Sequence, residues 1–343
     1  PPPPPPPPPP TPQHSSAASD VYKRQHYSLL DKTATRRKGE RCLDWRRKVE
    51  ISSRFVGTPL KEQHVEVSWR KTTNYAAAVG DANPRYFDDE RAEGLIAPPM
   101  FSVAVTWSTL SRIWDYLEDH DFPLHLLATQ VHYTEHLNFH RPIQPGDTLT
   151  IGGEIAAILP HRSGTLVVIR SDAVDGEGAP VFTEHAGTLL RGVRCTDEGA
   201  GSEGLPRVPP SPEPRTAPPL WEATIPIEPL RPYLYDGCAG ISFPIHTSTQ
   251  FAHNVGLPGI ILQGTATLAF AARELVDREA HGNPARLAAL YCRFTAMVPP
   301  GTEICVQLTG RQQRKDGISL HYVVLNDKGR QAISDGYALL HEP

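Results

Sequence analysis

The chain has 343 residues, with 34 Lys and Arg against 38 Asp and Glu, and a net charge of −4. This balance leaves no basic excess to neutralise phosphates, which argues against a nucleic-acid partner, and no apolar run approaches the roughly 20 residues that cross a bilayer. The five cysteines are scattered without C-x-x-C spacing, so they favour free thiols in a reducing, cytoplasmic compartment over disulfides or a zinc ribbon.

The first 49 residues predict no packed domain. The prolines at positions 1–10 would form a polyproline II rod, and positions 19–25 resemble translated adapter sequence. We therefore expect residues 1–49 to be a disordered or artefactual leader. A ligand for an SH3-type domain is the alternative interpretation of the proline run.

The next feature is a repeated skeleton. Residues 75–86 read Y-x4-G-D-A-N-P-R-Y, and residues 235–246 read Y-x4-G-I-S-F-P-I-H. The repeat predicts a duplicated chain, with two domains of roughly 100–150 residues each. Between the copies, positions 196–221 are rich in glycine and then in proline, which predicts a linker. We accordingly expect domains at residues 50–195 and 222–343.

Each half predicts one long helix. In the first half, two prolines open a segment whose apolar residues recur every three or four positions, as is typical of a long buried helix. This stripe consists of Val103, Trp107, Leu110, Trp114 and Leu117. In the second half, residues 264–279 carry an equivalent stripe, which is ended by a glycine and a proline at positions 282 and 284.

Four strands are predicted after each helix, because the segments there alternate between apolar and polar residues, are rich in β-branched residues and are separated by turn residues. They span residues 128–139, 148–159, 165–171 and 181–190, and then 287–297, 303–308, 319–325 and 331–340. A helix followed by consecutive strands indicates an α+β fold, in which the helix lies on a curled antiparallel sheet. This order excludes a βαβ dinucleotide fold, and the chain has no G-x-G-x-x-G motif.

Three histidines on the first of these strands suggest a metal site, but their spacing argues against one. His132, His136 and His140 fall at i, i+4 and i+8. On a strand they would share a face with neighbours about 13 Å apart, too far for one ion at ligand distances of about 2.1 Å. We expect no metal. The chain also has no G-x-S-x-G, P-loop or H-E-x-x-H motif.

The motifs resemble a known family. Residues 80–84 and the helix entry at 97–101 resemble the N-terminal domain of the MaoC-like dehydratases, and residues 240–246 with 257–267 resemble the hydratase domain that follows it. The resemblance implies a double hotdog, two antiparallel sheets each wrapped around a long central helix and joined edge to edge. It also implies reversible, cofactor-free hydration of enoyl thioesters of coenzyme A or acyl carrier protein to (R)-3-hydroxyacyl products.

The resemblance also implies the site residues. In the family an aspartate, and a histidine five residues later, handle the water and its protons, while an amide at the start of the helix holds the thioester oxygen. The second copy keeps the histidine as His246, whereas Ile241 and Phe243 stand at the aspartate and asparagine positions. The expected catalytic residues are His246 and Asp81, and the expected substrate-binding residues are Gly264, Gln263, Thr265, Asn83 and Tyr86.

Because neither copy is complete, several interpretations stay open. His246 acts with a carboxylate from elsewhere, such as Asp236 or Asp81; or Asp81 works with Tyr86; or the protein binds acyl thioesters without chemistry. A structural role is the alternative for His246 and for Asp81, whose side chain can bond its own turn. We expect a hydro-lyase whose partner is an acyl thioester, with no membrane partner and with homodimer formation left open. Its rivals are a non-catalytic binding subunit and a hotdog thioesterase, which needs a carboxylate opposite the helix start.

Overall fold

The computed structural model describes residues 49–119, 121–212 and 217–342. All of them belong to one compact unit, Val49–Pro343. The proline run and the adapter-like segment that we predicted as a leader lie outside the described residues. Within the described part of the chain, no helix is long and apolar enough to span a membrane.

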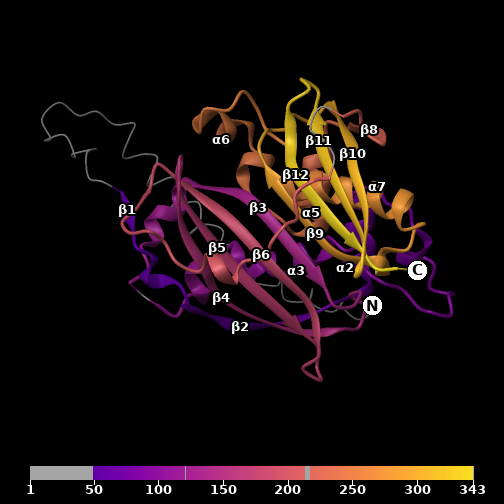
Figure 1. The fold of residues 1–343 in the computed structure, drawn as a ribbon, viewed down its shortest axis with the longest axis horizontal. Helices are drawn as coiled ribbons and strands as arrows, with labels where there is room; N and C mark the ends of the chain where they lie inside the picture. Colours follow the sequence, from indigo (N-terminus) through magenta and orange to yellow (C-terminus); the bar gives the residue numbers. More distant parts are fainter. Residues whose placement is uncertain (1–48, 120, 213–216, 343) are drawn as a thin grey trace, which may run out of the picture. The chain divides into compact units, whose positions relative to one another are not determined.

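The two halves share a common series, a strand, a helix, a 3-10 turn, a central helix and four strands, to which each half adds short elements of its own (Figure 1). The elements of the first half are β1 (Glu50–Ile51), η1 (Ser53–Phe55), β2 (Pro59–Glu66), α2 (Trp69–Ala78), η2 (Pro84–Tyr86), α3 (Phe101–Leu110), α4 (Ile113–Tyr116), η3 (Leu124–Thr129), β3 (Gln130–Phe139), β4 (Thr148–His161), β5 (Gly164–Val174), β6 (Pro180–Arg191) and β7 (Arg194–Cys195). Those of the second half are η4 (Ser202–Gly204), β8 (Trp221–Ile227), α5 (Arg231–Ala239), η5 (Pro244–His246), α6 (Thr249–Asn254), α7 (Gly264–Glu279), η6 (Pro284–Arg286), β9 (Leu287–Phe294), β10 (Thr302–Arg314), β11 (Gly317–Asn326) and β12 (Gln331–Leu340).

Ten strands form one sheet in the order β2-β4-β5-β6-β3-β9-β12-β11-β10-β8. All neighbours in this sheet are antiparallel. The order is the same read from either end, once each strand of one half is exchanged for its counterpart in the other. The duplication that the repeated motif predicts is therefore present in the topology.

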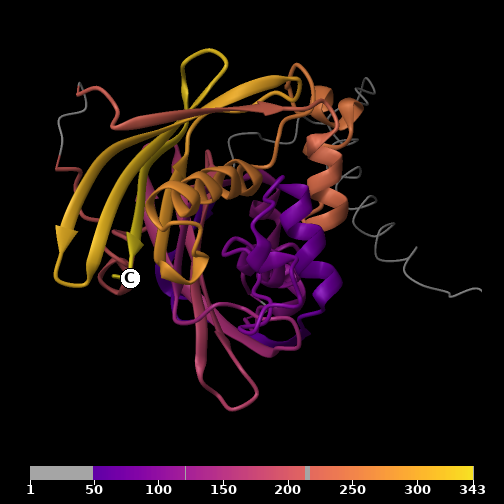
Figure 2. The ribbon, with the colours of Figure 1, turned by 90° about the vertical axis from the view of Figure 1, so that its right-hand side faces the viewer.

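The halves join where β3 lies beside β9, with Leu137 opposite Leu290 and His136 opposite Tyr291. A single large core cluster includes buried residues from both sides of this seam. Figure 2 shows α7 inside the curve of the second-half strands, with α2 and α5 beside it. The fold is α+β, a double hotdog, as the sequence predicts.

The second central helix has the predicted bounds, but the prediction of one long helix in the first half is wrong. The helix α3 ends at Leu110, because Arg112 leaves the helical region with φ −131° and ψ 39°. The short α4 follows, and Leu117 then turns extended and forms a bridge with Leu60 of β2. Ile113 and Leu117 pack in a separate core cluster around Leu60 and Phe122, so tertiary packing divides the helix.

All eight predicted strands are present, with ends that differ by a few residues; the largest difference is β10, which continues to Arg314. The edge strands β2 and β8 and the helices α2, α5 and α6 were not predicted. Part of the segment predicted as a linker runs along β4, since Ala200 and Ile158 exchange backbone hydrogen bonds of 3.0 and 3.1 Å. The segment then leads into β8. The domain boundaries stay a prediction.

Candidate functional site

The motif of the first half is a turn whose polar side chains bond to the backbone. It follows α2, and Gly80 at φ +60° reverses the chain. Oδ1 of Asp81 accepts from the backbone N–H of Asn83 at 3.1 Å, an Asx turn. Asn83 accepts in turn from the N–H of Arg85 and donates through Nδ2 to the carbonyl of Gly282 in the second half, at 2.8 Å. Asn83 therefore ties the two halves together.

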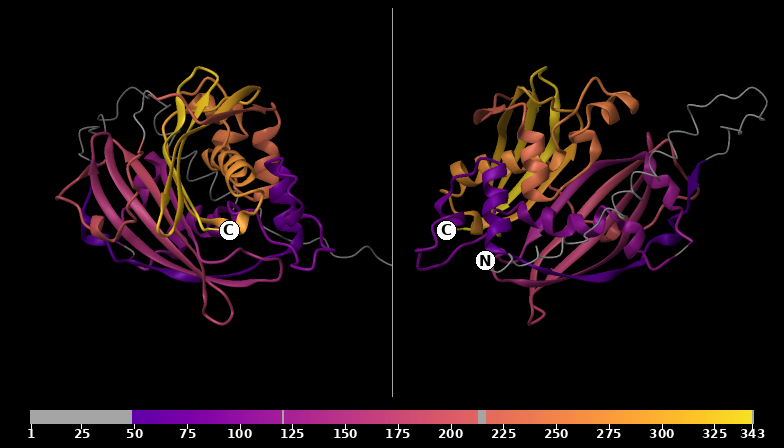
Figure 3. Two further views of the ribbon diagram at one scale, coloured as in Figure 1. Left: turned by 45° about the vertical axis from the view of Figure 1, so that its right-hand side comes forward. Right: turned by 180° about the vertical axis from the view of Figure 1, so that it is seen from behind.

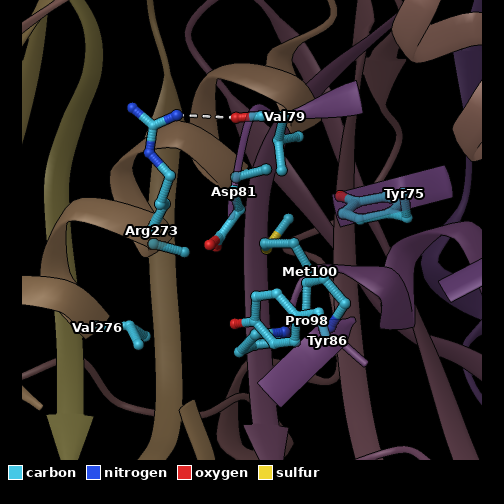
Figure 4. A pocket seen from close by; sticks show the side chains of 11 residues that line it. Tyr75, Val79, Asp81, Tyr86, Pro98, Met100, Arg273 and Val276 are labelled. Carbon is cyan, nitrogen blue, oxygen red and sulfur yellow. Dashed lines mark hydrogen bonds between the residues drawn. The ribbon is translucent and has the colours of Figure 1, made fainter. Parts of the chain in front are cut away.

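The carboxyl group of Asp81 is buried and points towards α7 of the second half (Figure 4). Burial raises its pKa to about 6, since the pull of the Asn83 N–H and of Arg273 is smaller and Asp277 adds repulsion. Arg273 itself donates to the carbonyls of Val79 and Gly80, at 2.9 and 3.2 Å. Asp81 is thus held between the first-half turn and the middle of α7.

Two hollows adjoin Asp81. The first has a volume of about 10 Å³, enough for about one water, and its lining includes Tyr75, Tyr86 and Met100. Tyr86 is almost fully buried, and burial with the nearby carboxyl group of Asp81 raises its pKa well above the ordinary value. The second is an open hollow of about 510 Å³ between the turn and α7, whose lining includes Arg273. Neither hollow is lined by residues of the second motif.

The motif of the second half ends in η5, where His246 is half-buried. Its Nδ1 donates to the carbonyl of Ile261 at 2.8 Å, so the neutral ring keeps the lone pair on Nε2. Burial lowers the pKa of His246 to about 4, although the Ile261 bond opposes this. Ile241 is buried where the family has its aspartate, and the ring of Phe243 lies 6.4 Å from that of His246.

The start of α7 comes three residues after Ile261. Gln263 precedes the helix and is buried, donating through Nε2 to the carbonyl of Pro232 at 3.0 Å. Oγ1 of Thr265 accepts from the hydroxyl of Tyr235 at 3.2 Å. A Cβ at Gly264 would lie 3.1 Å from the ring of Phe294, so this packing favours glycine. The first amides of a helix have no acceptor inside it, and the helix dipole makes this end positive.

The first half cannot form an equivalent of this helix start. The N–H of Ala97 donates to the carbonyl of Ile143, as the N–H of Leu262 donates to Val298, so positions 97 and 262 correspond. Pro99 then stands where the second half has Gly264. Proline has no N–H, and the amide that could hold an oxygen is missing from the first copy.

Asp81 and His246 lie beside different parts of α7. Asp81 lies beside Arg273, whereas His246 contacts the residues that precede Gly264. Nine residues separate these helix positions, about 13 Å at the helical rise of ~1.5 Å per residue. The other candidate carboxylate, Asp236, lies on α5, and burial raises its pKa while a hydrogen bond from Ser242 opposes the rise.

The sequence analysis missed a group that we call the buried carboxyl cluster: Glu135 on β3, Glu184 on β6 and His132 on β3. Both glutamates are 0 % exposed, and Nε2 of His132 lies 3.0 Å from Oε2 of Glu135. A β-bulge between His132 and Thr134 turns His132 towards Glu135, so the expectation that His132 and His136 share a face is wrong. The sequence did carry one signal for this cluster: two glutamates stand on apolar strands, at positions whose side chains face the core. Among the described residues, no group of three His, Cys, Asp or Glu side chains is placed to hold a metal ion.

Comparisons with known proteins agree with this architecture. A family model described as "FAS1-like, dehydratase domain region" matches residues 54–184, and one described as "MaoC like domain" matches residues 213–327. A UPF0336 protein of Streptomyces coelicolor is 34% identical over 131 residues, which are 37% of this chain and 85% of that protein. Peroxisomal multifunctional enzyme type 2 of Drosophila melanogaster is 27% identical over 216 residues, 60% of this chain but only 33% of that enzyme.

Among solved structures, a MaoC-like dehydratase from Phytophthora capsici superposes with a TM-score of 0.70 at 20% identity, covering 84% of this chain and 98% of that one. At this identity the likeness concerns the fold. The sequence matches, which cover both halves, carry the relationship further. The chain belongs to the MaoC-like dehydratase family and is related over 131 residues to a UPF0336 protein.

Proposed function

We propose that this protein is a hydro-lyase that reversibly hydrates enoyl thioesters of coenzyme A or acyl carrier protein to (R)-3-hydroxyacyl thioesters, with its reacting centre at the start of α7. Membership of a dehydratase family supports the reaction type. The placement rests on one observation: the carbonyl that orients His246 belongs to Ile261, three residues before Gly264 at the start of α7. A base and an amide donor thereby meet at one helix end.

His246 acts as the base for water. Because Nδ1 is committed to the Ile261 carbonyl, Nε2 is the nitrogen that can accept a proton. The lowered pKa of His246 keeps the ring neutral at pH 7. General base assistance of this kind is typically worth ~10²–10⁴-fold in rate.

The amide of Gly264 polarises the thioester. In hydration, negative charge builds on the carbonyl oxygen as water adds to C3, and an N–H at a helix start stabilises it. One such donor is worth about 10²–10³-fold. Gln263 and Thr265 flank this amide and are fixed by Pro232 and Tyr235, so they set the position of the helix start.

The residues of the first motif have a different part in this proposal. Pro99 removes the amide donor there, and Asp81 lies beside the middle of α7, so Asp81 and His246 do not share a water. Asn83 holds the two halves together through Gly282. Asp81 and Tyr86 line a small hollow at the boundary of the halves, outside the reacting centre.

The test is hydration of crotonyl-CoA, followed as loss of enoyl absorbance, with chiral analysis of the product. We expect His246→Gln to lower kcat by at least ~100-fold. His253→Gln is the matched control, because His253 also bonds a backbone carbonyl, that of Pro258, but is exposed. Unchanged turnover in His246→Gln would reject the assigned base.

Binding without chemistry is the second candidate, and Ile241 favours it, since the position has no proton acceptor. A protein of this kind would bind crotonyl-CoA yet neither consume the double bond nor release thiol. Release of free thiol would instead identify a thioesterase.

A further inference from the structure

The buried carboxyl cluster contains two acidic groups that interact with each other in the core. Glu135 faces Ala186 and Leu137 faces Glu184 across β3 and β6, so the two glutamates lie diagonally on one face. Both are fully buried, their carboxyl groups hydrogen-bond to each other when protonated, and Thr106 bonds to Glu184. The Nε2 of His132 lies within ion-pair distance of Glu135 but is not aligned for a hydrogen bond.

Such a pair holds a proton at neutral pH. Burial raises the pKa of Glu135 to about 8, and burial with repulsion from Glu135 raises that of Glu184 well above its ordinary value. Two interacting carboxylates in a dry core cannot both be charged, so a proton lost by Glu135 must leave Glu184 protonated. The cluster can therefore donate one proton and still keep another.

Two routes connect Glu135 to the start of α7. Through His132, the imidazole ring lies 4.7 Å from the ring of Phe294, which in turn fills the space beside Gly264. The second route runs through Tyr235, whose pKa is raised chiefly by burial and further by the charge of Glu135, and whose hydroxyl donates to Thr265. Glu135, which belongs to the first half, is thus linked to the start of α7, the same helix end beside which His246 of the second half lies.

The other side chains near the two glutamates come from the helices α2 and α3 and from the strand β9. Tyr75 of α2 and Cys292 of β9 both have pKa values raised chiefly by burial and further by the charge of Glu135. Thr106 of α3 lies against Glu184. None of these groups is basic, and the Thr106 hydrogen bond stabilises the carboxylate of Glu184, whereas His132 contacts that of Glu135.

We propose that Glu135, with Glu184 and His132, supplies the acid–base group that completes the centre at the start of α7, in place of the carboxylate that Ile241 cannot provide. The inference rests on the proposed hydration. In that step the water oxygen bonds to C3, and its proton passes to Nε2 of His246. The π electrons of the double bond take a proton from the carboxyl group of Glu135 onto C2.

The protons balance through solvent. Glu184 shares its proton with the new carboxylate of Glu135, and His132 positions that carboxylate through the 3.0 Å contact. His246 then releases its proton to solvent and the cluster takes one up from solvent, so the net change is the addition of one water. For an acyl chain held at the Gly264 amide, contact with Glu135 requires the ring of Phe294 to turn aside.

The experiment compares crotonyl-CoA hydration by the full chain with Glu135→Gln, Glu184→Gln and His136→Gln. His136 is the matched control, because it adjoins Glu135 on β3 but contacts His185 and Tyr291 on the other face. We expect kcat to fall at least ~100-fold in Glu135→Gln with little change in KM, a smaller fall in Glu184→Gln, and none in His136→Gln. Thermal melts confirm that each variant folds.

A second readout does not need turnover. Butyryl-CoA has no double bond, and its binding should shift the infrared carbonyl band of a protonated carboxyl group that disappears in Glu135→Gln. If the wild type hydrates crotonyl-CoA and Glu135→Gln does so within about twofold, the inference fails while the proposed function stands. If the wild type does not hydrate crotonyl-CoA, the proposed function fails, and the infrared band then tests the place of Glu135 separately. A shift of the band on butyryl-CoA binding would show that Glu135 meets the acyl chain. No shift would overturn this part of the inference as well.

Discussion

The hydroxyl groups of Tyr75 and Tyr235, equivalent residues 160 positions apart, lie 3.0 Å from each other in the fully buried centre of the protein. Their rings meet edge to face at 5.7 Å, and Tyr235 also donates to Thr265 at the start of α7. The contact joins α2 and α5, which lie side by side in Figure 3. The repeated tyrosine therefore links the two halves, and Tyr235 connects this contact to the start of α7.

Removing either hydroxyl should weaken this interface. We expect Tyr75→Phe to lower the free energy of unfolding by about 1 kcal/mol, since it breaks one buried hydrogen bond. Tyr235→Phe should cost more, because it also removes the donor to Thr265. Chemical denaturation of both variants and the double variant measures the coupling; additive effects would show that the two hydroxyls do not interact.

The amide of Gly264 can be tested by copying the first half into the second. Gly264→Pro removes the N–H, and proline is accepted in the first turn of a helix. Since Phe294 fills the adjacent space, the change is made together with Phe294→Ala, and Gly264→Ala with Phe294→Ala is the control that keeps the N–H. We expect kcat for crotonyl-CoA about 10²–10³-fold lower in the proline variant than in its control. Equal rates would remove the amide from the mechanism.

The pH profile of hydration should be bell-shaped. His246 must be neutral to accept a proton, so the rate falls as the pH drops towards its lowered pKa of about 4. Glu135 must be protonated to donate, so the rate also falls as the pH rises through about 8. Initial rates in constant-ionic-strength buffers locate both limbs. An acid limb at the ordinary histidine pKa of ~6.5 would show that His246 is not held as described.

Glu135 should also make stability depend on pH. Its pKa is raised from 4.5 to about 8, so the folded state holds a proton that the unfolded chain has released between these values. The resulting stability is present below pH 4.5 and is lost as the pH rises towards 8. We expect the free energy of unfolding of Glu135→Gln to fall less over this range than that of the wild type, by on the order of a few kcal/mol. Parallel slopes in urea titrations at several pH values would contradict this.

Asp81 and Asn83 should affect stability rather than turnover. Asp81→Asn keeps an acceptor for the Asn83 N–H, and we expect its kcat to stay within about twofold of the wild type. Asn83→Ala loses the bond to Gly282 between the halves and should lower the free energy of unfolding by about 1–2 kcal/mol. A large loss of kcat in Asp81→Asn would return this residue to the reacting centre.

Much of the fold could be predicted, because the strands after each helix alternate and are bounded by turn residues. The edge strands could not: β2 is polar along most of its length, and β8 contains Pro226, which is tolerated where one side of a strand is unpaired. The end of α3 at Leu110 could not be predicted either, because the apolar stripe of the sequence continues beyond it. Only the contact of Leu117 with Leu60 shows that the second part of the stripe serves a different cluster.

The site was predictable where a motif carried it. The repeat located His246 and Asp81, but local sequence could not show that His246 lies beside the start of α7 and Asp81 beside its middle. It also could not show that Pro99 stands at the position of Gly264, since that match depends on two hydrogen bonds to distant loops. Glu135 and Glu184 belong to no motif, and they come together only through the register of β3 with β6. The roles of all these side chains stay predictions until the variants are measured.

The seam between β3 and β9 is built within a single polypeptide, and this has an evolutionary consequence. When two identical subunits pair, every substitution appears twice, and a change that damages one centre damages its twin. Here the two copies differ: the first has Tyr86 and Pro99 where the second has His246 and Gly264, and the second has Ile241 where the first has Asp81. A chain that carries both halves can hold a change at one helix start and leave the other helix start intact.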